Sequence, residues 1–236
     1  MSLILRADVD KPYGRKGLIR KIASKLVEDY IGEPWQASTI YLSHLALFLE
    51  YCNKSNIPGF ICHRNCTRPN ESITKLLQQG NHKVCFHAEN TSSYEAFITE
   101  LALFKNNTPD FNIESFTKHG SGKLKLGKKH YPPYEPEKYK EWALRAGMGY
   151  YFGNGTGVSL EELIPKNNFF ENVFCIENEC ESLTSEKLKL LMDIAKNQNV
   201  VVLIHPCNFH ASKKVASYFM LLVKLAKEKN IRWRIF

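Results

Sequence analysis

The chain has 236 residues, of which 44% are hydrophobic, so it can bury a large core, and its length fits one α/β barrel-sized domain over residues 1–236. The formal net charge of +8 indicates attraction to anionic partners. However, the basic residues are spread along expected helices, where solvated faces explain most of them. The sequence carries no recognition-helix motif and no ribonucleoprotein-type aromatic signature, so we expect no nucleic-acid partner.

Neither the N-terminal sequence nor any later segment has the pattern of a membrane-inserted helix. Charges interrupt the N-terminus too early for a secretory signal, and no run of about 18 apolar residues could span a bilayer. We therefore expect a soluble, cytoplasmic protein, and peripheral contact with a membrane stays open. The seven cysteines have irregular spacing and are expected to be reduced thiols. Cys62, His63 and Cys66 favour packing over a zinc knuckle, because no second pair has zinc-finger spacing.

The first half of the chain alternates short β-branched or aromatic runs with helical spacing of apolar residues. In chain order, we expect a strand over 3–9, helices over 17–31 and 37–53, a strand over 59–63, a helix over 71–80, a strand over 82–87, a helix over 92–105 and a strand over 113–119. This alternation favours parallel strands joined by crossover helices.

The pattern breaks over residues 120–134, where turn signals replace periodicity, and a loop of this length in a compact domain is usually functional. After the loop we expect a helix over 136–146, a strand over 149–152, a loop over 153–157, a strand over 173–177, a helix over 184–197, a strand over 200–205, a helix over 211–229 and a strand over 231–235. The whole chain then holds seven or eight β/α units, which is an α/β fold.

Several ionisable residues fall where an expected strand ends: Asp8, Asp10, His87, His119 and His205. The loops at the carboxyl ends of parallel strands share one face of the sheet or barrel, and active sites form there. Asp8 and Asp10 are two positions apart on one strand, so their carboxylates project to the same side. We therefore expect these side chains to lie together at one rim.

The residue types in this set suit metal-assisted acid–base chemistry. One of the two carboxylates can bind a metal while the other handles protons. A neutral imidazole such as His87 can ligate a cation through one ring nitrogen. His205 follows a strongly apolar strand, is fixed by Pro206 and can act as an acid or base. Each histidine alone is more often structural, but together with the aspartate pair they indicate a site.

Four segments in this order resemble a known family: LRADVDKP, GNHKVCFHAEN, FTKHGSG with HYPPY downstream, and VVLIHP. They look like the motifs of the polysaccharide deacetylases, the NodB-homology group of carbohydrate esterases, and the resemblance spans nearly the whole chain. It implies a distorted (β/α) barrel of about seven parallel strands and a metal-dependent hydrolase that removes acetyl groups from N-acetylated sugars. By this resemblance, Asp8 is the general base, Asp10 and His87 are metal ligands, and His205 protonates the leaving amine.

The chain departs from the family pattern at the second metal histidine, which normally follows the first by four residues. Here that position is Thr91. His119 is our candidate for the replacement ligand; Glu89 as an oxygen ligand and an inactive site are the open alternatives. The family's arginine–proline–tyrosine segment, which shapes the acetate pocket, has two counterparts in this chain, TKHGSG and HYPPYEP, and the sequence does not decide between them.

A mixed set of carboxylate and imidazole ligands favours zinc and also admits manganese, iron, cobalt or nickel. The expected substrate is a carbohydrate, an N-acylated amino sugar or its carrier-linked precursor. Lys118, Tyr134 and Asn154 are our candidates for substrate contacts near the rim. A catalytically inactive protein of the same fold, binding a glycan or a protein partner, is the alternative function.

Overall fold

The structure, a computed structural model, describes residues 2–10, 39–120, 131–157, 159–163, 169–180 and 185–236. The helix expected over 17–31 and most of the loop expected over 120–134 lie outside these ranges. Within the described part of the chain, none of the helices combines the length and the apolar character needed to cross a bilayer. Among the described residues, no disulfide joins two cysteines.

Helices and strands alternate along most of the described residues. Their order is β1 (Ser2–Val9), α2 (Thr39–Lys54), β2 (Gly59–His63), η1 (Asn65–Thr67), α3 (Glu71–Gln79), β3 (Lys83–Ala88), α4 (Tyr94–Asn107), β4 (Ser115–Lys118), α5 (Pro136–Arg145), β5 (Tyr150–Gly155), η2 (Glu161–Leu163), β6 (Phe169–Asn172), β7 (Phe174–Cys175), α6 (Ile176–Glu179), α7 (Ser185–Asn197), β8 (Asn199–Ile204), α8 (Pro206–Ala211), α9 (Lys213–Glu228) and β9 (Arg232–Trp233).

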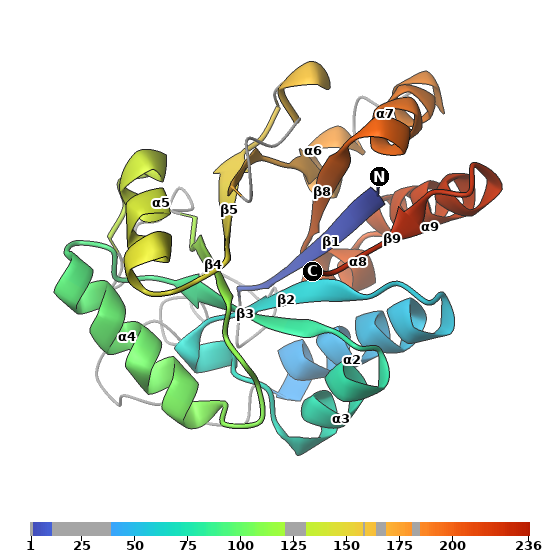
Figure 1. The fold of residues 1–236 in the computed structure, drawn as a ribbon. Coiled ribbons are helices and arrows are strands. Elements are labelled where there is room, and N and C mark those ends of the chain that lie inside the picture. Colours follow the sequence, from blue (N-terminus) through green and yellow to red (C-terminus); the bar gives the residue numbers. More distant parts are fainter. Residues whose placement is uncertain (1, 11–38, 121–130, 158, 164–168, 181–184) are drawn as a thin grey trace.

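The strands form one parallel sheet in the order β6-β5-β4-β3-β2-β1-β8-β7, with β9 beside the start of β1. A single residue, Val173, separates the two edge strands β6 and β7, and its backbone N–H donates to the carbonyl of Gly155 on β5 at 2.8 Å. Residues 169–175 are thus one extended segment that pairs first with β5 and then with β8. This segment closes the sheet into a (β/α) barrel with seven strand positions, as the sequence predicts (Figure 1).

The differences from the predicted elements lie mainly in the second half. Residues 153–155, expected in a loop, continue β5, and β6 was not expected at all. The strand expected over 173–177 ends at Cys175, because a short helix begins at Ile176. The basic helix expected over 211–229 is preceded by a separate helix, α8, and Ser212 breaks the two apart by capping the first turn of α9.

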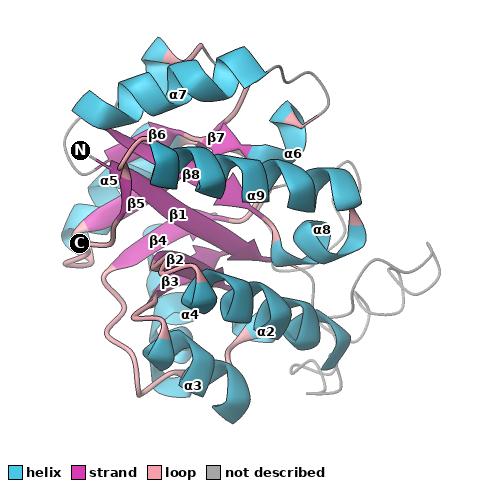
Figure 2. Cartoon of the chain, turned by 90° about the vertical axis from the view of Figure 1, so that its right-hand side faces the viewer, coloured by secondary structure: helices cyan, strands magenta, loops and turns pink. Residues whose placement is uncertain are grey.

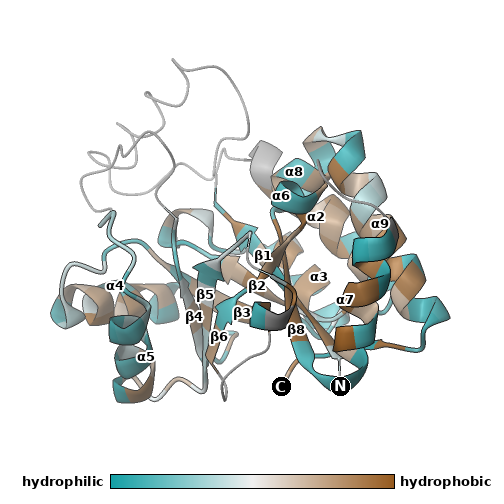
Figure 3. Ribbon diagram, turned by 90° about the horizontal axis from the view of Figure 1, so that it is seen from above, coloured by the Kyte–Doolittle hydropathy of each residue, from teal (hydrophilic) through white to brown (hydrophobic). Residues whose placement is uncertain are grey.

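Apolar side chains pack in two separate layers, one outside the barrel and one inside it. Helices surround the strands, with α7 and α9 covering the β8 side and α2 and α3 the β2 and β3 side (Figures 1 and 2). β8 is strongly hydrophobic along most of its length (Figure 3), because it faces both layers. The inner layer comprises Ile4, Phe60, Cys62, Cys85, Phe152, Phe170, Val173, Cys175, Val201 and Leu203.

Strand β1 shows how one sequence supplies both layers. Leu3, Leu5, Ala7 and Val9 belong to the outer core, which contains the helix faces. The alternate positions Ile4, Arg6 and Asp8 face the barrel interior, since successive side chains of a strand point to opposite sides. The interior is therefore apolar near the start of β1 and charged toward its end.

The turn after α3 buries a histidine that is distant from the carboxyl ends of the strands. His82 is 5% exposed, and its Nε2 lies 2.8 Å from Oδ1 of Asn53 on α2. Burial lowers the pKa of His82 to about 4. The neutral ring is therefore the form that the fold accepts.

We expect His82 to make the protein sensitive to acid. The unfolded chain takes up a proton near pH 6.5 and the folded chain near pH 4, so stability is full above pH 6.5 and falls as the pH drops through this window, by up to roughly 3 kcal/mol from this residue. Urea unfolding at several pH values should show a flatter acid limb for His82→Gln than for the wild type. If the stability of both proteins fell in parallel with pH, His82 would not be the source of the acid sensitivity.

Candidate metal centre

The strand-end residues predicted from the sequence come together at the carboxyl end of the barrel. Asp8 lies in β1 and Asp10 directly after it, His87 lies near the end of β3, His119 follows β4, and His205 follows β8. The parallel sheet places the ends of these strands at one rim. Side-chain exposure differs across the cluster: the side chain of His87 is 1% exposed and that of His205 is 23% exposed.

Asp10 is at the centre of the cluster, and its two carboxylate oxygens face different histidines. Oδ1 lies 2.8 Å from Nε2 of His87 and 3.4 Å from Nδ1 of His119. These two ring nitrogens are 3.0 Å apart. Oδ2 of Asp10 lies 3.2 Å from Nε2 of His205. One oxygen thus faces the pair of histidines, and the other faces the third.

The donor set fits a divalent transition metal. One carboxylate and two imidazoles offer their ligand atoms within 4.8 Å of one another, from three different strand ends. Burial is the largest influence on the pKa of His119 and lowers it, which favours the neutral ring that a metal ligand requires. Burial would raise the pKa of Asp10, but His119 and His205 hold it well below its usual value, so the carboxylate stays ionised. Nitrogen and oxygen ligands of this kind suit zinc and its neighbours among the transition metals.

Asp8 lies below Asp10 and is held by a buried arginine. Nε and Nη2 of Arg6 donate to the two oxygens of Asp8 at 2.8 and 2.6 Å. Burial alone would raise the pKa of Asp8, but the guanidinium and His87 hold it below the usual value. Oδ2 of Asp8 is 3.9 Å from Nε2 of His87, so this carboxylate reaches the edge of the ligand cluster.

The three residues expected to contact substrate make hydrogen bonds within the protein. Asn154 accepts from Nη2 of Arg6 at 2.7 Å and donates to the carbonyl of Lys118 at 2.6 Å. Nζ of Lys118 is buried and donates to the carbonyl of His119 at 2.8 Å. Tyr134 is 42% exposed, and its hydroxyl accepts from the backbone N–H of Asn154. Lys118 and Asn154 thus support the cluster, and their contact with substrate stays a prediction, as does that of Tyr134.

His205 lies between two carboxylates. Its Nδ1 is 3.1 Å from Oε1 of Glu177, which also accepts from the backbone N–H of His205 at 2.6 Å and from Nδ2 of Asn208 at 3.2 Å. Burial alone would lower the pKa of His205, but Asp10 and Glu177 hold it well above its usual value. The ring is therefore kept as an imidazolium, the form that can donate a proton.

The residues considered for the missing histidine have different surroundings in the structure. The hydroxyl of Thr91 is buried and lies 3.2 Å from the hydroxyl of Tyr139 on α5. Oε1 of Glu89 lies 2.5 Å from Nη2 of Arg64. Among the described residues, two groups could hold a metal ion, one of Asp10, His87 and His119 and one of Asp8, Asp10 and His205, and Glu89 belongs to neither. Of the two counterparts of the acetate-pocket segment, TKHGSG contains His119; His130, in the other, lies outside the described residues.

Sequence reasoning missed two residues that the cluster depends on, Arg6 and Glu177. The period-two pattern of LRADVD places Arg6 on the same side as Asp8 and Asp10, so alternation could have found it. Glu177 ends the apolar run VFCIE, the same kind of position as that of His205 after β8. Arg6 was missed because the run around it was interpreted as an apolar strand. Glu177 was missed because it was assigned to the end of a strand, whereas the structure begins a helix at Ile176.

We expect Arg6→Met to destabilise the protein by about 3–5 kcal/mol, because it leaves Asp8 buried without its counter-charge. The double variant Arg6→Met with Asp8→Asn should recover much of that loss, since no charge is then left unpaired. Urea unfolding followed by circular dichroism measures both. A loss below about 1 kcal/mol for the single variant would show that Asp8 is compensated by other groups.

Comparison with known proteins finds no matching family model and no matching curated protein. Among solved structures, the chain is similar to the catalytic domain of peptidoglycan N-acetylglucosamine deacetylase from Eubacterium rectale ATCC 33656, with 11% identity, coverage of 98% of this chain and 86% of that one, and a TM-score of 0.46. It is also similar to a Streptococcus mutans CE4 esterase, with 13% identity, coverage of 98% and 84%, and a TM-score of 0.45. At these values the likeness carries no argument about activity, which has to come from the geometry of the site.

Proposed function

We propose that the protein is a metal-dependent hydrolase that removes an acyl group, such as acetyl, from an N-acylated amino sugar or its carrier-linked precursor. One observation supports this most strongly: two imidazole nitrogens, from the ends of β3 and β4, lie at one oxygen of Asp10, while an imidazolium contacts its other oxygen. A metal that activates water and an acid that protonates the departing nitrogen both promote the hydrolysis of an amide, and this arrangement places candidates for both at one carboxylate. The family resemblance of the sequence motifs supplies the substrate class.

In this proposal, Asp10, His87 and His119 hold a divalent cation, zinc in the first place. When bound there, such a cation lowers the pKa of water and polarises the acyl carbonyl. Asp8 takes the proton from the attacking water, and Arg6 fixes the direction of its carboxylate. His205 donates a proton to the departing nitrogen, so that the amine leaves in its neutral form. A cytoplasmic location would favour a soluble or carrier-linked precursor over a mature polymer.

The direct test measures bound zinc and released acetate on the same samples. Wild-type protein loaded with zinc should release acetate from oligomers of N-acetylglucosamine, and removal of the metal by a chelator should abolish the release. His119→Ala should weaken zinc binding by at least about 100-fold and reduce acetate release in parallel, because one of three ligands is lost. The matched control is His210→Ala, a change of an exposed histidine that stacks on His44 outside the cluster; zinc and activity should stay at wild-type levels.

The outcomes separate the proposed enzyme from its inactive counterpart. Zinc binding without acetate release from oligomeric, nucleotide-linked or lipid-linked N-acetylated sugars would favour a glycan-binding or partner-binding protein. Equal zinc occupancy in the wild type and in His119→Ala would remove His119 from the ligands. Absence of zinc, manganese, iron, cobalt and nickel binding by the wild type would end the metal-dependent proposal.

Glu177→Gln should change the pH profile of the same reaction. The substitution keeps a hydrogen-bonding side chain next to His205 but removes a negative charge, so the pKa of His205 falls. A general acid is lost as the pH rises through its pKa, and the alkaline limb of the profile should therefore move to lower pH, by about one pH unit. Glu179→Gln is the control, because Glu179 lies in the same helix and pairs with Lys187 instead. An unmoved alkaline limb in Glu177→Gln would argue against His205 as the acid.

A further inference from the structure

The residues after β2 reach across to the end of β1. The last paired positions of these two strands are Val9 and His63, so Asp10 lies one residue beyond the sheet pairing. The hydroxyl of Thr67 donates to the carbonyl of Val9 at 2.6 Å, and Nη1 of Arg64 donates to the carbonyl of Asp10. Side chains from the β2 loop thus hold the backbone of Asp10 where the strand ladder has ended.

The same guanidinium also reaches the end of β3. Nη2 of Arg64 lies 2.5 Å from Oε1 of Glu89, and the two side chains are 3% and 14% exposed. Glu89 comes two residues after His87, directly after β3. Its backbone N–H and that of Asn90 donate to the carboxylate of Glu100 on α4 at 3.1 and 2.9 Å. The segment after β3 that Arg64 binds is therefore itself hydrogen-bonded to α4.

We propose that Arg64 is a positioning residue for the metal centre: by joining the Asp10 carbonyl to the Glu89 carboxylate, it sets the spacing between the ligands of β1 and β3. This inference rests on the proposed metal site. An arginine suits the task because its planar fork can donate to two acceptors in fixed directions, which the single ammonium of lysine cannot do. Outer-shell groups that orient ligands commonly change metal affinity 10–100-fold when they are altered.

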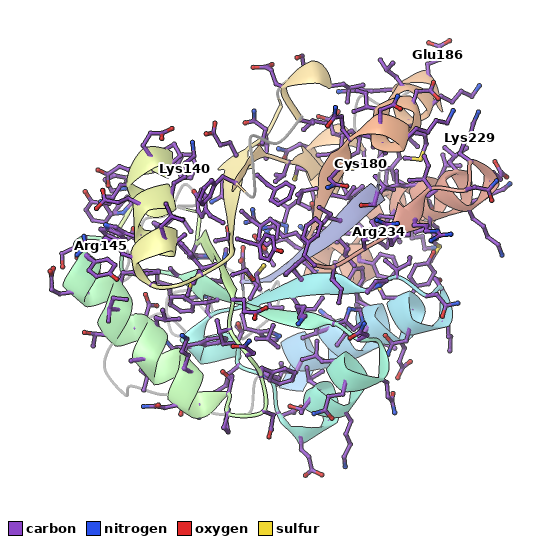
Figure 4. All side chains as sticks on the ribbon, viewed as in Figure 1. Lys140, Arg145, Cys180, Glu186, Lys229 and Arg234 are labelled. Carbon is purple, nitrogen blue, oxygen red and sulfur yellow. The ribbon has the colours of Figure 1, made fainter. Side chains whose placement is uncertain are left out.

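The test uses zinc alone, titrated into the full-length, metal-free protein against a chromophoric chelator, with the absorption spectrum of the cobalt-substituted protein as a second readout. Arg64→Lys keeps the charge but loses the fork, and should weaken zinc binding about 10–100-fold and shift the cobalt bands. The control is Arg145→Lys at the exposed end of α5 (Figure 4), where the guanidinium stacks on Tyr94. Its zinc affinity and cobalt spectrum should equal those of the wild type.

A second pair of variants covers the case in which Arg64→Lys fails to fold and excludes a direct ligand role for Glu89. Glu89→Ala removes the anchor of Arg64 and should weaken zinc binding, whereas Glu89→Gln keeps an oxygen acceptor and should retain most of the affinity. If Glu89 bound the metal itself, Gln would lose as much as Ala, and the proposed bridge would be wrong.

The result that overturns the inference alone is wild-type zinc affinity and an unchanged cobalt spectrum in folded Arg64→Lys or Glu89→Ala. Failure of the wild type to bind zinc or cobalt would instead overturn the metal site and the inference with it. Thermal unfolding of each variant distinguishes a misplaced ligand from a damaged fold, since a positioning role predicts lower metal affinity at a nearly unchanged melting temperature of the metal-free protein.

Discussion

Compensation of buried charge is the constraint on which the centre of this protein depends. An ionised carboxylate inside a barrel is strongly disfavoured unless a counter-charge and hydrogen bonds surround it. Asp8 is compensated by Arg6, Asp10 by the histidines around it, and His205 by Asp10 and Glu177. Each charge at the barrel mouth is therefore fixed by its neighbour. The same contacts that make these groups tolerable inside the protein also hold them in place and in their ionised forms.

The apolar interior of the barrel lies directly beneath this layer of charged side chains. Its interior below Arg6 is filled with apolar side chains, among them the stacked rings of Phe152 and Phe170. The segment over 169–175 contributes to this filling from both of its strands, because it pairs with β5 on one side and β8 on the other. Apolar surroundings lower the local dielectric constant, so the charges within each ion pair interact more strongly here than they would at the protein surface.

Much of the fold and of the cluster could be predicted from the sequence because both follow local patterns. Apolar runs of strand length gave β1, β2, β3 and β8, and the charged residues that end such runs had to meet once the strands were parallel. The missed features depend on tertiary context. Strand β6 has a sequence, FFEN, too short to stand out, and it forms because the edge of β5 offers it a hydrogen-bonding partner. The bonds of Arg64 and Asn154 join residues far apart in the chain, which no spacing rule reveals.

The position of His119 shows that spacing in the sequence is a weak guide to which side chains meet at the rim. In the family pattern that the motifs resemble, the second histidine follows the first by four residues, and here the chain at that position turns its Thr91 hydroxyl toward Tyr139. Strands β3 and β4 are adjacent and parallel, with His87 paired to Thr117, so a residue just after β4 lies beside the end of β3. The backbone N–H of His119 donates to the carbonyl of Ala88 at 2.7 Å and continues that pairing.

A side chain placed just after β4 can therefore reach the same point at the rim as a side chain in the loop after β3. What has to be conserved for chemistry is the meeting point in space, and adjacent parallel strands offer more than one sequence position that reaches it.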